Sequence, residues 1–314
     1  MDPRNKTTVT EFILQGFPII PELEIFLFVL FLLIYVLSLT GHLLIIMLTC
    51  MDYHLHTPMY FFLTNFFFLE IVITTTVVPK MLANLLAEKK TISFLGCVVQ
   101  CFFYFLVGTA ELFVLSAMSF DRYVAICDPL HYSTILTWKL CHYLILGSWL
   151  GGLLSISIPT VLKLQLPFCG PNIINHFFCD SGPLIKLACS DTRLIQLLDF
   201  FLFSLVVLSS LILTIVSYIN IAITILRIPC TSGRGKAFST CAAHLTVVAL
   251  GYGSTIFIYV TPSQVSSLEM NKLVCVLNVF VTPALSPFIF SLRNEKVKEA
   301  LKSAIAKCLA LAHR

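Results

Sequence analysis

The length, composition and charge of the chain exclude a soluble globular protein. Its 314 residues are 58% hydrophobic and only 11% charged, with a formal net charge of +4. This number of charged side chains is too small to cover the surface of a soluble globular protein of this size. The composition therefore predicts a membrane protein, most of which is surrounded by the lipid bilayer. Lys and Arg are scattered rather than clustered, which argues against a nucleic-acid partner.

Apolar runs long enough to cross a bilayer recur seven times along the chain. A membrane-spanning helix needs about 20 apolar residues, and no signal-peptide core precedes the first run. Short connections favour an antiparallel helix bundle. We therefore expect an all-α membrane protein with a tail at 1–24, a membrane domain at 25–292 and a C-terminal segment at 293–314. The seven spans are expected at 25–48, 58–86, 93–126, 140–162, 194–226, 237–260 and 272–292.

The C-terminal segment has the pattern of an amphipathic helix. Between residues 294 and 309, apolar side chains including Val297, Leu301 and Ile305 alternate with lysines. This pattern predicts a helix that lies in the membrane interface with its apolar face toward the lipid. Cys308 falls on that apolar face, where a palmitoylated and an unmodified thiol are both consistent with the sequence.

Cysteines and a glycosylation sequon indicate which end of the bundle faces outward. Cys97, Cys169, Cys179 and Cys189 fall at one end, and four cysteines allow three pairings. Because disulfides persist only in oxidising surroundings, we expect this end, and with it the N-terminus, to be extracellular. The sequon at Asn5 agrees with this orientation. Lys and Arg are nearly balanced, with eleven on one side and nine on the other.

Asp121 and Arg122 are adjacent charges at the end of the third apolar run. A charge at the bilayer centre costs about 2.5 to 3.5 kcal/mol, so the pair is expected at a membrane face or inside the bundle. The orientation above places it at the cytoplasmic end. Two interpretations are open: an ion pair at a helix end, or a switch in which Asp121 binds Arg122 until a partner competes.

Glu70 and Glu111 are two of the few ionisable residues that the sequence places within the spans. Glu111 precedes Arg122 by eleven residues, which puts it on the same helix face about 16 Å away. If the two glutamates meet across the bundle, they share a proton or bind a cation such as Na⁺. A purely structural, protonated glutamate is the alternative.

Periodicity predicts a ligand cavity in the outer half of the bundle. The residues that share a face form an apolar, aromatic lining with hydroxyl groups and no formal charge above Glu111, which suits a small, mostly uncharged organic molecule. Such faces are also typical of helix packing, which remains the alternative. These residues are Tyr104, Phe105, Gly108, Thr109 and Leu112 in the third span and Tyr252, Thr255, Ile256 and Tyr259 in the sixth.

No sequence motif indicates catalysis or transport. There is no Gly-rich phosphate loop, His-Glu-x-x-His run or Cys-x-x-Cys pair, and no inverted pair of broken spans. His176, Cys179 and Asp180 have the donor types of a copper site, although a disulfide at Cys179 would remove its thiolate. Otherwise no metal site or cofactor is expected, apart from the Na⁺ considered above.

Five sequence motifs resemble those of olfactory receptors of the tetrapod-type class, within the rhodopsin-like G-protein-coupled superfamily. The resemblance covers nearly the whole chain. The motifs read LHTPMYFFL at 55–63, MSFDRYVAIC at 118–127, LPFCGPN at 166–172, KAFSTC at 236–241 followed by His244, and PFIFSLRN at 287–294.

The resemblance implies roles for individual residues. It implies disulfides Cys97–Cys179 and Cys169–Cys189, and an odorant site among the third, fifth, sixth and seventh spans. In that site Val206 and Tyr259 match pocket positions and Tyr252 matches a toggle position, while Glu70 and Glu111 match an acidic pair. The positions implied for G-protein coupling are Asp121, Arg122, Tyr123, Tyr218 and His244.

The chain departs from the family pattern at three positions of the polar network between pocket and cytoplasm. His42 and Ser286 stand where the family usually has Asn, and Phe290 stands where it usually has Tyr. These departures put basal activity and coupling strength in question, but not the fold.

We therefore expect a receptor, not an enzyme, in the plasma membrane of sensory cilia. The resemblance implies that it binds small volatile organic ligands and activates the olfactory stimulatory heterotrimeric G protein, which raises cyclic AMP. Two alternatives are a rhodopsin-like receptor for a non-odorant molecule, and a transporter or channel. A channel would need a continuous polar path, which two glutamates do not provide.

Overall fold

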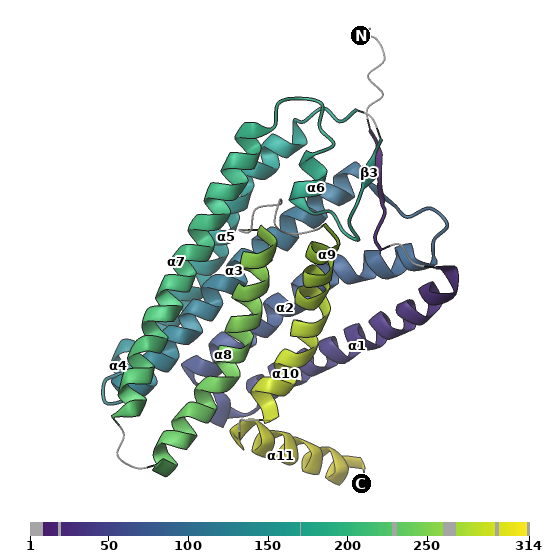
Figure 1. Cartoon of the computed structure of the whole chain (residues 1–314). Helices are drawn as coiled ribbons and strands as arrows, with labels where there is room; N and C mark the ends of the chain where they lie inside the picture. Colours follow the sequence, from purple (N-terminus) through teal and green to yellow (C-terminus); the bar gives the residue numbers. More distant parts are fainter. Residues whose placement is uncertain are drawn as a thin grey trace.

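Seven helices in the described part of the chain are long and apolar enough to cross a membrane, which confirms the predicted fold class (Figure 1). The computed structural model describes residues 9–17, 20–169, 171–227, 231–259, 268–292 and 295–312. The first six spans are α1 (Pro21–Met51), α2 (Pro58–Leu86), α3 (Phe94–Cys127), α5 (Trp138–Leu164), α7 (Arg193–Leu226) and α8 (Thr231–Tyr259). The seventh consists of α9 (Leu268–Val276), a π-helical turn η2 (Leu277–Val281) and α10 (Thr282–Leu292).

Local sequence signals explain where several helices begin. Pro21 and Pro58 lie in the first turn of α1 and α2, where their missing N–H costs no helical hydrogen bond. Ser93 caps α3 by accepting a hydrogen bond from the Gly96 amide at 3.1 Å, and Thr137 caps α5 in the same way. The proline in α1 lies four residues before the expected start of the span, so the helix is longer than its apolar run.

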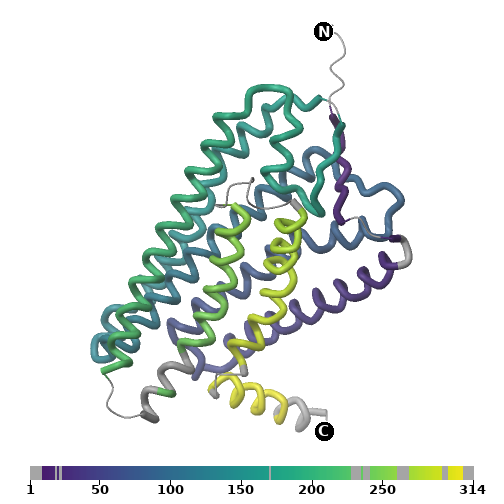
Figure 2. The backbone as a smooth tube through the Cα atoms, in the orientation of Figure 1, coloured from purple at the N-terminus to yellow at the C-terminus, as the bar shows by residue number. Residues whose placement is uncertain are grey.

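Helix α3 passes through the bundle and packs against α2, α5, α7 and α8. Its contact with α5 is close because Gly152 has no side chain: a Cβ there would lie 2.7 Å from the Leu106 carbonyl oxygen. Figure 2 shows the first and last spans side by side despite their separation in sequence. They meet closely at Gly41, where a Cβ would lie 3.1 Å from Pro287.

We expect Gly152→Ala to destabilise the receptor by about 1–3 kcal/mol, because the added methyl overpacks the contact between α3 and α5. Thermal unfolding of the detergent-solubilised protein measures the effect. Gly147→Ala is the matched control, since that glycine lies on the same helix and a Cβ there meets nothing within 4 Å. Equal melting temperatures for the two variants would contradict the proposed role of Gly152.

A small sheet covers one end of the bundle, which we call the capped end. Strand β1 (Glu11–Leu14) pairs antiparallel with β2 (Thr91–Ser93) and parallel with β3 (Ile173–Ile174). Phe12 and Leu14 point inward and are buried, as the alternation of a half-buried strand requires. Part of the expected tail at 1–24 is therefore ordered, since residues 11–14 are in the sheet and α1 already begins at Pro21. Asn5 lies outside the described residues.

Two disulfides and one buried lysine fix the long loop at the capped end. Disulfides join Cys97 to Cys179 and Cys169 to Cys189. Lys272, at the start of the seventh span, is 1% exposed. Its ammonium group donates to the Gly16 carbonyl at 2.7 Å, to Asn175 at 2.6 Å and to Glu269 at 3.0 Å. The loop also contains the short helix α6 (Ser181–Ile185).

The opposite end of the bundle carries the short helices η1 (Tyr53–Leu55) and α4 (Tyr132–Ile135), and α11 (Glu295–Ala312). Helix α11 runs across this end (Figure 1) and contacts α1 and α10. Its residues Val297 and Ala300 are buried against the bundle, whereas Ile305 is exposed. The helix expected at 294–309 is therefore present, but the apolar side chains of its first turns face the bundle rather than the lipid. The side chain of Cys308 lies outside the described residues.

Candidate functional site

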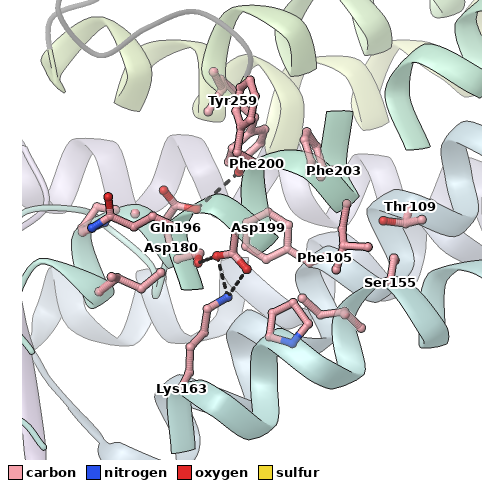
Figure 3. Close-up of a pocket in the computed structure, with 18 of the residues that line it drawn as sticks. Phe105, Thr109, Ser155, Lys163, Asp180, Gln196, Asp199, Phe200, Phe203 and Tyr259 are labelled. Atoms are coloured by element: carbon pink, nitrogen blue, oxygen red, sulfur yellow. Dashed lines mark hydrogen bonds and ion pairs between the residues drawn. The ribbon is translucent and has the colours of Figure 1, made fainter. Parts of the chain in front are cut away.

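A cavity of about 510 Å³ lies beneath the long loop at the capped end, between α3, α5, α7 and α8 (Figure 3). Its size is that of a typical small-molecule site. One part of the wall is aromatic and aliphatic, and another part is charged. The aromatic and aliphatic residues include Phe105, Ile156, Pro159, Phe200, Phe203, Val206 and Tyr259.

A second, much smaller cavity of about 40 Å³ lies against the main one. The two share Phe105, Thr109, Phe203 and Tyr259, so they follow the same face of α3. The small cavity also reaches Glu111. Its further lining residues are Ile73, Tyr104, Gly108, Leu112, Gly251, Thr255, Asn278 and Val279.

Most of the predicted pocket residues line one of these two cavities. Tyr252 and Ile256 are the exceptions, since they line neither cavity. Tyr252 is 3% exposed and lies deeper, where its hydroxyl is 3.2 Å from the Ser116 hydroxyl. Of the four residues predicted in the sixth span, Thr255 and Tyr259 line a cavity.

Charged side chains on the cavity wall contradict the prediction of no formal charge above Glu111. The Lys163 ammonium contacts both carboxylate oxygens of Asp199, at 3.1 and 2.8 Å, and Ser181 donates to Asp199 at 2.5 Å. The Lys163 side chain is only 3% exposed. The sequence signal was available, because Asp199 falls inside the predicted fifth span. In the sequence, Lys163 has the pattern of a surface residue at a helix end. Its partner Asp199 is 36 residues away, so the sequence alone does not indicate the ion pair.

We expect Asp199→Asn to destabilise the receptor by about 2–4 kcal/mol, because it leaves the buried Lys163 ammonium without a carboxylate. The double variant Lys163→Met with Asp199→Leu is expected to recover most of this loss, since it removes both charges. Asp191→Asn is the control, because Asp191 pairs with Arg193 at the exposed surface. Thermal unfolding of all three variants tests the expectation, and a double variant no more stable than the single one would contradict it.

Asp180 also lines the main cavity, next to the disulfide at Cys179. Its carboxylate accepts a hydrogen bond from the Tyr259 hydroxyl at 3.4 Å. Burial raises the pKa of Asp180 to about 6, and the nearby Lys163 ammonium opposes that shift. The Tyr259 hydroxyl also lies 3.5 Å from that of Tyr104, so this corner of the cavity joins the loop, α3 and α8.

The copper hypothesis for His176, Cys179 and Asp180 is wrong. Cys179 is bonded to Cys97 and has no thiolate to offer. The His176 ring instead accepts a 3.4 Å hydrogen bond from the Phe178 amide, and burial lowers its pKa to about 3. Across the residues that the structure describes, no group of three His, Cys, Asp or Glu side chains is arranged to hold a metal ion.

Glu70 and Glu111 lie within electrostatic range of each other in the core of the bundle. Glu70 is 1% exposed, and its Oε1 atom has no hydrogen-bond partner among the described residues. A buried carboxylate oxygen without a partner is costly.

Polar contacts below the cavity connect three helices. The Ser116 hydroxyl of α3 donates to the Ser210 carbonyl of α7 at 2.8 Å and lies 3.3 Å from the Thr214 hydroxyl. The Tyr252 hydroxyl of α8 donates to the Leu112 carbonyl at 3.2 Å. A movement of α8 at the cavity therefore disturbs its hydrogen bonds to α3 directly, and it reaches α7 only through Ser116.

At the opposite end of α3, the Asp121 carboxylate contacts Arg122 and Tyr132. The Arg122 Nε atom donates to Asp121 at 2.9 Å, a second guanidinium nitrogen contacts the same carboxylate oxygen, and Tyr132 donates to the other at 2.7 Å. Asp121 is 1% exposed. The charge pair is therefore closed in this structure, with its carboxylate oxygens occupied.

Tyr218 and His244 form a second contact at this end. The Tyr218 hydroxyl is hydrogen-bonded to the His244 ring, so α7 and α8 are joined there. Tyr123 packs beside them against a cluster that contains Ile221, Ile225 and Cys241. The five residues implied for coupling thus lie at the same end of the bundle. Asp121 and Arg122 form one hydrogen-bonded group, Tyr218 and His244 form another, and Tyr123 packs against apolar side chains.

Two of the three departures from the family pattern contact each other. The His42 ring lies 3.2 Å from the Ser286 hydroxyl and packs on Phe67. Phe290 packs against Phe67 at 5.9 Å between ring centroids. The substituted positions therefore form one contact group that joins α1, α2 and α10.

This arrangement defines a class of protein. A seven-helix bundle with a small-molecule cavity at one end and a closed Asp-Arg pair at the other end of the same helix is the architecture of a G-protein-coupled receptor.

Comparison with known proteins gives the family. A family model described as "Olfactory receptor" matches residues 31–308. Olfactory receptor 6J1 of Homo sapiens is 54% identical over 294 residues, which cover 94% of this chain and 85% of the relative. Olfactory receptor 6F1 of Homo sapiens is 52% identical over 96% of this chain and 98% of the relative, and olfactory receptor 6E1 of Mus musculus is 51% identical over 96% and 97%.

The chain belongs to the olfactory receptor family. It is thus an odorant receptor of the G-protein-coupled class and a multi-pass protein of the plasma membrane, with a small ligand and a G protein as partners. It is not an enzyme, because members of this family transmit a signal to a partner rather than convert a substrate.

Proposed function

We propose that the 510 Å³ cavity binds small volatile organic molecules and that their binding activates the olfactory stimulatory G protein, which raises cyclic AMP. One observation supports this most strongly: α3 lines the cavity with Phe105 and Thr109 and carries the Asp121–Arg122 pair near its opposite end. Ligand binding needs to favour the active packing by only a few kcal/mol to shift the population.

A cyclic-AMP reporter screen against a broad panel of volatiles tests this proposal. The matched variant is Val206→Phe, which adds an aromatic ring to the cavity wall, and Val216→Phe on the exposed face of the same helix is its control. We expect responses in the parent receptor and the control that fall at least tenfold in potency in Val206→Phe. Equal potency in all three would place the ligand outside this cavity.

We further propose that the capped end is extracellular and that the receptor works in sensory cilia. Both disulfides lie at the capped end, where an oxidising environment would preserve them. An epitope tag at the N-terminus should be labelled by antibody in intact cells expressing the receptor. Labelling that requires permeabilised cells would contradict the orientation.

Glu70 and Glu111 are proposed to hold a Na⁺ ion or a shared proton. The donor set fits either, because carboxylate oxygens are hard ligands and Glu111 lines the cavity of about 40 Å³, which has room for one small ion. Titrating Na⁺ against ligand-induced signalling in Glu111→Gln tests the ion. Loss of the Na⁺ effect in this variant supports the site, and an unchanged Na⁺ response argues against it.

A further inference from the structure

The charged part of the main cavity has more negative than positive groups. Three charged side chains meet there: Lys163, Asp199 and Asp180 (Figure 3). Lys163 contacts both oxygens of Asp199, so this lysine is already neutralised by one carboxylate. Asp180 is the additional carboxylate. This part of the wall therefore has one negative charge in excess.

Other ionisable groups on the wall leave this excess in place. Lys186 lines the cavity but is exposed, so water screens its charge at the rim. His176 also lines the cavity and is neutral, because burial lowers its pKa to about 3. Glu111, on the wall of the adjoining small cavity, contributes no positive charge.

The Asp180 carboxylate has unused hydrogen-bonding capacity. It accepts one long bond of 3.4 Å from the Tyr259 hydroxyl and one from the Ser181 backbone amide. An ionised carboxylate offers about four acceptor positions. Since Asp180 is only 8% exposed, bulk water has little access to the remaining positions. A ligand that donates hydrogen bonds and carries a positive charge would complement this group.

The rest of the cavity suits an apolar ligand body. Phe105, Phe203 and Val206 form one wall, and Ile156 and Pro159 form another. A carboxylic acid would place a second negative charge near Asp180 and Asp199, where like charges repel. A hydrocarbon would leave Asp180 desolvated without a new partner.

We infer that this cavity selects primary amines with an apolar body, with Asp180 as the counter-ion of the ammonium group. The inference rests on the proposed function, because it assigns a ligand class to the same cavity. It replaces the expectation of a mostly uncharged ligand, whose premise was a cavity without formal charge.

Octylamine, octanol and octanoic acid, which share one alkyl skeleton, test the inference in the cyclic-AMP reporter assay. We expect octylamine to be the most potent of the three on the parent receptor. Asp180→Asn should lower its potency about tenfold or more while leaving that of octanol within about threefold, since a charged hydrogen bond is lost. Asp191→Asn, which removes an exposed carboxylate on the same end, is the matched control.

A second measurement needs no substitution and remains decisive if Asp180→Asn fails to reach the cell surface. Lowering the external pH from 7.4 to 5.5 crosses the pKa of about 6 at Asp180, so octylamine should lose potency relative to octanol. The octanol response corrects for effects of pH on the other ionisable groups that face Asp180. These are Lys163 from α5, Asp199 from α7, Tyr259 from α8, Cys101 and Tyr104 from α3 and Cys275 from α9.

The outcomes separate this inference from the proposed function. A preference for octanoic acid, or an amine potency unchanged by both Asp180→Asn and acid pH, would overturn the amine assignment alone. Responses to other volatiles but not to any amine would do the same. A receptor at the cell surface that is silent to the three compounds and to the whole volatile panel would overturn the proposed function as well.

Discussion

Asp121→Asn is expected to raise cyclic-AMP signalling severalfold in the absence of ligand. The buried Asp121 carboxylate binds the Arg122 guanidinium through Nε at 2.9 Å and accepts a hydrogen bond from Tyr132 at 2.7 Å. Asparagine keeps the shape but removes the charge, so Arg122 becomes free to contact a G protein. Charge-assisted hydrogen bonds are about twice as strong as neutral ones, which makes this the largest single effect expected at that end.

The measurement is basal reporter activity normalised to surface receptor. Tyr132→Phe should give an intermediate increase, because it removes one of the contacts to Asp121 and leaves the charge. Asp128→Asn is the control, since that half-buried carboxylate pairs with His131 instead of Arg122. Basal activity that is the same in Asp121→Asn and Asp128→Asn would show that the charge pair does not restrain the receptor.

Cys97→Ser is expected to remove most of the receptor from the cell surface. The disulfide to Cys179 closes a loop of 82 residues, and loss of such a crosslink costs about 4 kcal/mol in the chain-entropy model. Both cysteines are fully buried. The bond also fixes Asp180, the next residue, at the cavity, so any remaining receptor should have weakened ligand responses.

Surface labelling by flow cytometry measures this effect. Cys169→Ser should cost less, because its disulfide closes a separation of 20 residues and both cysteines are exposed. Cys50→Ser, at an exposed free cysteine, should leave the surface level unchanged. Similar surface levels for Cys97→Ser and Cys50→Ser would contradict the importance assigned to the buried bond.

The helices were predictable because their signals are local. The expected span at 58–86 has the bounds of α2 (Pro58–Leu86), where a proline marks the start. The expected fifth span ends with α7 at Leu226. By contrast, strand β1 was not predicted. Four residues form a strand there only because two distant segments, Thr91–Ser93 and Ile173–Ile174, supply the hydrogen-bonding partners.

The candidate site was predictable to the extent that one helix face determines it. Periodicity placed Phe105 and Thr109 on the cavity side of α3, and both line the main cavity. The charged wall depends on the approach of α5 and α7, which brings Lys163 to Asp199 across 36 residues of sequence. The periodicity within one helix does not indicate which residues of another helix lie nearby. For this reason the cavity was expected to be uncharged, although it contains an ion pair and a further carboxylate.

The contact between two residues that depart from the family pattern was likewise not predictable from the sequence. In the sequence, His42 and Ser286 are separate exceptions to the family pattern at opposite ends of the membrane domain. In the structure, their side chains are 3.2 Å apart. The two departures therefore form one contact, which joins α1 to α10.

The central claim is that ligand binding in the capped cavity activates a G protein through Arg122. Ligand-dependent nucleotide exchange on the purified olfactory stimulatory G protein, with membranes containing the receptor or Arg122→Ala, measures this directly. Exchange should rise with ligand in the parent receptor and be lost in Arg122→Ala at an equal receptor level. Undiminished ligand-dependent exchange in Arg122→Ala would contradict it.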